Sequence, residues 1–118
     1  MRVMKFITVL IAVLVVNISV YGYDKAKVDR YIREAEYYTK QAEGFEREAV
    51  CYTRLAQKNM KDAEYYSKKG NDSKAKTYIQ WAKEASDKAT LRMKKAKDSR
   101  KKAQLRMKWA NDEMKNNV

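Results

Sequence analysis

Alanine recurs at every seventh position through most of the chain. One series begins at Val28 and continues as Ala35, Ala42, Ala49, Ala56 and Ala63. A second series consists of Ala75, Ala82, Ala89, Ala96, Ala103 and Ala110. An apolar residue that returns strictly every seven positions is typical of α-helices packed in a left-handed supercoil. The pattern therefore predicts an alanine-rich coiled coil.

The two series are out of phase with each other, which predicts a turn between them. Ala63 and Ala75 lie twelve residues apart, which is not a whole number of heptads. Gly70 falls in the break and suits the left-handed position that ends a helix, and Asp72, or alternatively Asn71, can cap the next helix. We therefore predict an all-α fold in which residues 23–118 form an antiparallel hairpin, with helices over about 24–69 and 73–116 and a turn at 70–72.

Larger side chains accompany each alanine series and predict the second half of the helix interface. In the first helix they stand three residues after each member of the first series, as Tyr31, Tyr38, Phe45, Tyr52, Asn59 and Tyr66. In the second helix we assign the positions three before each alanine from Ala82 on, namely Ile79, Ser86, Met93, Arg100 and Met107, with Met114 next in the series. With Ala63 facing Ala82, this register pairs Tyr66 with Ile79. Layers of aromatic and Met side chains should then supply most of the buried area.

Some apolar residues lie outside this predicted interface. The candidates for a further contact are Cys51, Tyr37, Tyr65, Trp81 and Trp109. Each Tyr and Trp pair is separated by 28 residues, or four heptads, so its members share a helix face. Because an isolated two-helix hairpin buries little surface, we expect a homodimer that forms a four-helix bundle. Cys51 would bridge the two chains or remain a free thiol, and scattered surface apolar groups are the plainer alternative.

The first 22 residues have the composition of a secretory signal peptide. Arg2 and Lys5 precede an apolar run over Phe6–Val16, and Val20 and Gly22 suit the positions before a cleavage site. Cleavage after Gly22 would release residues 23–118 as a secreted, extracellular protein. A retained signal anchor is the alternative, although the apolar run is shorter than the roughly 18–20 residues that span a membrane.

Positive charge is concentrated in the second predicted helix. The net charge of the chain is +12, and residues 73–118 contain 14 basic and 5 acidic side chains, against 11 and 10 in residues 23–72. The densest stretch supplies Lys88, Arg92, Lys94, Lys95, Lys97, Lys101, Lys102, Arg106 and Lys108. Such a face predicts binding to an anionic polymer or an anionic surface. A solvated face, partly neutralised by acids of the first helix, is the alternative.

The residues that most enzymes rely on are scarce. The sequence has no His and a single Cys, so it offers no imidazole base and no cysteine-based zinc site. We expect no catalytic residues, no metal, no cofactor and no small-molecule substrate. Our interpretation is a small secreted binding protein with a macromolecular partner. A self-assembling extracellular coiled coil and a cationic membrane-active protein are the alternatives.

Overall fold

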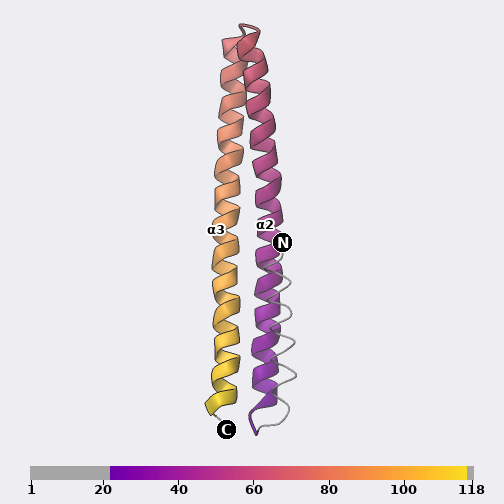
Figure 1. Ribbon diagram of the computed structural model, residues 1–118, viewed down its shortest axis with the longest axis vertical. Helices are drawn as coiled ribbons and strands as arrows, with labels where there is room; N and C mark the ends of the chain where they lie inside the picture. The colour runs from indigo at the N-terminus through magenta and orange to yellow at the C-terminus, as the bar shows by residue number, and fades with distance from the viewer. Residues whose placement is uncertain (1–21, 117–118) are drawn as a thin grey trace. The chain divides into compact units, whose positions relative to one another are not determined.

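The described part of the chain is helical almost throughout. The computed structural model describes residues 22–116, which contain two long α-helices, α2 (Lys25–Lys68) and α3 (Asp72–Asn116), and no strand (Figure 1). The prediction of an all-α chain with two long helices is confirmed. The predicted signal peptide, residues 1–22, lies outside the described residues apart from Gly22.

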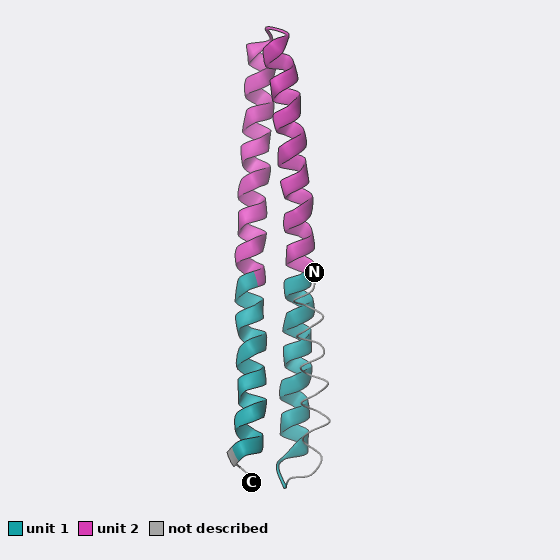
Figure 2. Ribbon diagram, in the orientation of Figure 1, with its two compact units in different colours: residues 1–43, 97–118 teal, residues 44–96 magenta. Residues whose placement is uncertain are grey.

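Each helix contributes to two compact units (Figure 2). Unit 1 comprises residues 1–43 and 97–118, and unit 2 comprises residues 44–96. Within unit 1, Lys27 pairs with Glu113, whereas Glu34, further along α2, pairs with Arg106, earlier in α3. The two helix segments of this unit therefore run antiparallel. Unit 2 contains the turn, so its two segments form a hairpin.

The turn between α2 and α3 is closed by backbone hydrogen bonds. Gly70 has a φ of 77°, the left-handed conformation expected of the residue that ends α2. Its N–H donates to Ser67 O (3.0 Å), and the N–H of Asn71 donates to Tyr66 O (2.9 Å). This pair of bonds satisfies two carbonyl groups at the helix end, as in a Schellman motif. Asn71 then caps α3, because its Oδ1 accepts the N–H of Lys74 at 3.1 Å.

The alanine series forms the buried line of both units. Every alanine of the α3 series is buried, as are the alanines of the α2 series except the half-buried Ala56. In unit 1, Val28, Ile32, Ala35 and Ala110 form one buried cluster. The small side chains of the alanine series let the helix backbones approach closely.

The predicted second line of contacts is correct for α2 and wrong for much of α3. The aromatic residues predicted for this line in α2 are half-buried and Asn59 is buried. In unit 2, however, Ile79 is 49% exposed and Met93 is 51% exposed, so neither supplies a buried layer. Tyr66 stacks on Tyr78 instead, with ring centroids 5.4 Å apart. In unit 1, Met107 and Met114 do pack against the buried cluster.

The two flanks of α2 differ in the side chains that they present to α3. On one flank, Met93 borders a shallow hollow whose α2 lining is Ala49, Val50, Thr53, Arg54 and Gln57 and includes no aromatic ring. On the other flank, α2 presents aromatic rings, and α3 covers them with long cationic side chains that start one residue before Met93. The aliphatic stems of Lys and Arg can cover apolar surface while their charged ends stay in water. The interface is therefore completed by residues that a hydrophobic pattern counts as polar.

Candidate polyanion-binding surface

In unit 2, two of the predicted polyanion-binding residues lie over one aromatic ring. The ring of Tyr52 has Lys88 Nζ and Arg92 Cζ each at 5.7 Å from its centroid. Arg92 Nε also donates to Glu48 Oε2 at 2.5 Å, and only 24% of the Arg92 side chain is exposed. The charge of this guanidinium group is therefore offset within the unit, which leaves little of it for an outside ligand.

Unit 1 repeats this arrangement fourteen residues away along each helix. Lys102 Nζ and Arg106 Cζ lie 5.6 Å and 5.4 Å from the ring centroid of Tyr38. Arg106 Nε donates to Glu34 Oε2 at 2.6 Å, and its guanidinium group is also 4.3 Å from the ring of Trp109. Such contacts between a cation and a ring contribute about 0.5–1 kcal/mol each at exposed sites.

The same register continues at other heptads of unit 2. Lys95 Nζ lies 5.8 Å from the ring centroid of Phe45, and Lys74 Nζ lies 4.8 Å from that of Tyr66. A lysine of α3 that lies seven residues earlier in the chain therefore contacts the ring of α2 that lies seven residues later. Five of the nine predicted residues are placed by this register against α2: Lys88, Arg92, Lys95, Lys102 and Arg106.

The remaining predicted residues point away from the helix interface. Lys97, Lys101 and Lys108 of unit 1 are exposed, and none has an ion pair or ring contact with a described residue. Lys115 continues their spacing and is exposed as well. At 100° per residue these four side chains fall within about 40° around the axis of α3. We call this set the lysine ridge: Lys97, Lys101, Lys108 and Lys115. Lys94 is exposed in the same way but belongs to unit 2.

Lys115 and a basic column on α2 were not among the residues predicted to bind a polyanion. The column repeats every seven residues and consists of Arg33, Lys40, Arg47, Arg54, Lys61 and Lys68, all of them exposed. Lys68 pairs with Glu64 at 3.4 Å. The seven-residue spacing of these basic residues is visible in the sequence. The net charge of the first helix does not reveal the column, because acidic residues elsewhere on α2 balance it.

The residues predicted to mediate oligomerisation make contacts within their own units. Trp109 packs edge-on against Tyr31, at 5.6 Å between ring centroids. Trp81 packs edge-on against Tyr78 in unit 2. Tyr37 and Tyr65 remain more than half exposed, and Cys51 is an exposed free thiol.

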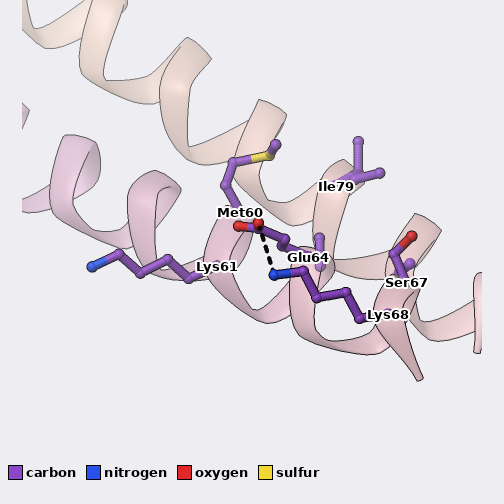
Figure 3. A pocket seen from close by; sticks show the side chains of 8 residues that line it. Met60, Lys61, Glu64, Ser67, Lys68 and Ile79 are labelled. Atoms are coloured by element: carbon purple, nitrogen blue, oxygen red, sulfur yellow. Dashed lines mark ion pairs between the residues drawn. The ribbon is translucent and has the colours of Figure 1, made fainter.

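A shallow groove in unit 2 lies beside the exposed Ile79 (Figure 3). Its volume is about 510 Å³, and its floor includes Ala63 and Ala75. Met60 of α2 and Ile79 of α3 stand at its sides, and the ion pair between Glu64 and Lys68 lies at its edge. The groove is largely apolar, so a helix face with large apolar side chains would fit it better than a charged ligand.

Comparison of the chain with models of protein families, with curated proteins and with solved structures found no match. Across residues 22–116, neither helix is long and apolar enough to cross a membrane. In the same range, no three His, Cys, Asp or Glu side chains gather closely enough to hold a metal ion. The arrangement of charged and apolar side chains is therefore the guide to function.

Proposed function

We propose that this chain is a small secreted binding protein that engages a linear anionic polymer through the lysine ridge. Secretion is supported by the composition of residues 1–22, with the Arg2 and Lys5 charges ahead of an apolar run. We propose that the chain binds this polymer without catalysing a reaction, since the ridge consists of exposed lysines alone. The observation that carries the proposal is the separation of the basic residues of α3 into two groups.

That separation distinguishes the ridge from an ordinary solvated basic face. Arg92 and Arg106 are paired with carboxylates, and the lysines next to them lie over rings. The ridge lysines lie on one side of α3 with no such partner among the described residues. Their ammonium groups are exposed and can bind an outside anion without breaking an existing contact with the described residues.

The geometry of the ridge suits a linear ligand. Lys97 and Lys115 are eighteen residues apart, which corresponds to about 27 Å at the rise of an α-helix. The four charges therefore form a straight row, which matches a chain of repeated sulfate or phosphate groups better than a single compact anion. A polymer bound in this way releases its condensed counterions, so affinity should fall steeply with salt.

The direct test is binding of purified residues 23–118 to heparin over a range of salt concentrations. Four contacts predict that the logarithm of the association constant falls with the logarithm of salt concentration with a slope of about −3. A neutral polysaccharide of similar length serves as the control. Absence of heparin binding at low salt would contradict the proposal. Parallel titrations with single-stranded DNA and anionic vesicles would identify which anionic partner binds most tightly.

The groove in unit 2 favours self-assembly as a second candidate function, with a second copy of this chain as the occupant. The region combines protruding side chains such as Met60 and Met93 with hollows floored by Ala49 and Ala63. A surface with both features can be self-complementary about a two-fold axis. Its few half-exposed apolar side chains offer less than the ~800 Å² per partner of a standard interface. The expected dimer is therefore weak.

Sedimentation velocity over a wide concentration range tests self-assembly. We expect the sedimentation coefficient of the unmodified protein to rise with concentration, and Ile79→Lys to remove that rise by placing a charge beside the groove. Leu91→Lys is the matched control, because Leu91 is 47% exposed in the same unit and does not line the groove. A concentration-independent monomer would exclude the second candidate.

A further inference from the structure

An acceptor motif for N-linked glycosylation begins in the turn between the helices, at Asn71, and continues into the first turn of α3. Asn71, Asp72 and Ser73 form an N-x-S triplet whose middle residue is not proline. Such a triplet is a substrate only when it lies on an accessible part of a secreted protein. A second triplet, Asn17-Ile18-Ser19, falls within the predicted signal peptide. Asn71 is therefore the acceptor that would remain in residues 23–118.

The structure places Asn71 where a glycan can be carried. Asn71, Asp72 and Ser73 are all exposed. The left-handed Gly70 precedes them, and no atom beyond Gly70 and its two chain neighbours lies within 4 Å of the point where a Cβ on Gly70 would stand. The surroundings of the turn are thus open to solvent. Helix interiors offer no comparable site, because their backbones are held in hydrogen bonds on all sides.

The two polar atoms of the Asn71 side chain have separate roles. Oδ1 accepts the backbone N–H of Lys74 and so caps α3. No described group accepts a hydrogen bond from the side-chain nitrogen Nδ2 of Asn71. A glycan is attached through that nitrogen and leaves the carbonyl oxygen unchanged. The folded hairpin therefore tolerates the modification without losing its helix cap.

We propose that Asn71 is N-glycosylated during passage through a eukaryotic secretory pathway. The donor is an oligosaccharide linked through its anomeric carbon to a lipid diphosphate. The Asn71 amide nitrogen forms a bond to that carbon, the bond between the carbon and the diphosphate oxygen breaks, and the lipid diphosphate leaves. The amide proton passes to a base of the transferase, and no oxidant or reductant is needed. The inference rests on the proposed secretion and is independent of polyanion binding.

The test is expression of the full chain, including residues 1–22, in insect cells, with recovery of the protein from the medium. We expect reduced electrophoretic mobility that is reversed by an amide-cleaving glycosidase, together with conversion of Asn71 to Asp in the peptide mass map. Ser73→Ala should abolish the modification while keeping the Asn71 cap, and Ser73→Thr should retain it. Equal helicity of these two variants by circular dichroism shows that folding is not the cause.

The possible failures of this experiment are distinguishable. A secreted chain that the glycosidase leaves unchanged would overturn the inference about Asn71 alone. An unmodified chain retained inside the cell would overturn both that inference and the proposed secretion. Glycosylation that persists in the Ser73→Ala variant would place the modification elsewhere and would also overturn the assignment.

Discussion

Retention on immobilised heparin should be lost when Glu replaces the four residues of the lysine ridge, in the variant K97E/K101E/K108E/K115E. A lysine near an anionic surface contributes about 1 kcal/mol, so removing four such contacts costs about 4 kcal/mol, or roughly a thousandfold in affinity. Reversal of charge adds repulsion to that loss. Because all four side chains are exposed and make no ion pair with described residues, helicity and thermal stability should change little.

A variant with the same change in net charge separates the ridge from a general charge effect. The matched control places Glu at four exposed lysines of unit 2, in the variant K58E/K61E/K76E/K83E. This protein should keep most of its heparin affinity, with a modest loss from reduced long-range attraction. Equal loss of retention in both variants would show that overall charge, and not the ridge, determines binding.

The second large effect is expected from the substitution Ala42→Leu. Ala42 belongs to the alanine series of unit 1 and is completely buried. A Leu side chain there would force the helix segments apart, and overpacking of this kind typically costs about 1–3 kcal/mol. For a domain of this size the melting temperature should fall by about 10 °C. Thermal unfolding followed by circular dichroism measures the change.

Ala26→Leu is the control for the intrinsic effect of Leu on the helix. Ala26 is exposed in the first turn of α2, and Leu and Ala differ little in helix propensity. The melting temperature of this variant should stay within a few degrees of the unmodified protein. If Ala42→Leu proved as stable as Ala26→Leu, the alanine series of unit 1 would not be a close-packed contact.

The alanine series and the turn could be predicted because each is encoded locally. A seven-residue repeat assigns the buried face of a helix regardless of its partner. Gly70 acts within a single turn of backbone, so its role follows from residue type, whereas residue type favoured Asp72 over Asn71 as the cap and only the structure identifies Asn71. The positions of α2 and α3 therefore follow closely from the pattern of the sequence.

The second line of contacts on α3 could not be derived in the same way. Ile79 and Met93 are more apolar than Tyr78 and Arg92, and the hydrophobic pattern selects them for the interface. Their burial depends on the partner helix, which offers no aromatic ring on the flank beside Met93 and places its rings on the other flank, under residues such as Arg92. Pairing between helices, and not the character of one helix, determines which residues are covered.

Pairing between the helices also determines which of the predicted basic residues are available to a ligand. The nine basic residues are equivalent in the sequence, since all are charged and closely spaced. Their separation into ring-covered residues and the lysine ridge follows from the register against α2, which places Lys102 over Tyr38 and leaves Lys101 outside. A sequence analysis that assigned heptad positions to charges as well as to apolar residues would have found the ridge, including Lys115.

The most direct test of this account is the proton NMR spectrum of the lysine ε-methylene groups, recorded with and without a heparin oligosaccharide. We expect ring currents to shift the signals of Lys88, Lys95 and Lys102 upfield, and heparin to move these signals little. The signals of the lysine ridge should have ordinary positions and should move on titration. Ring-shifted signals from the ridge, or heparin contacts confined to Lys88, Lys95 and Lys102, would contradict the account.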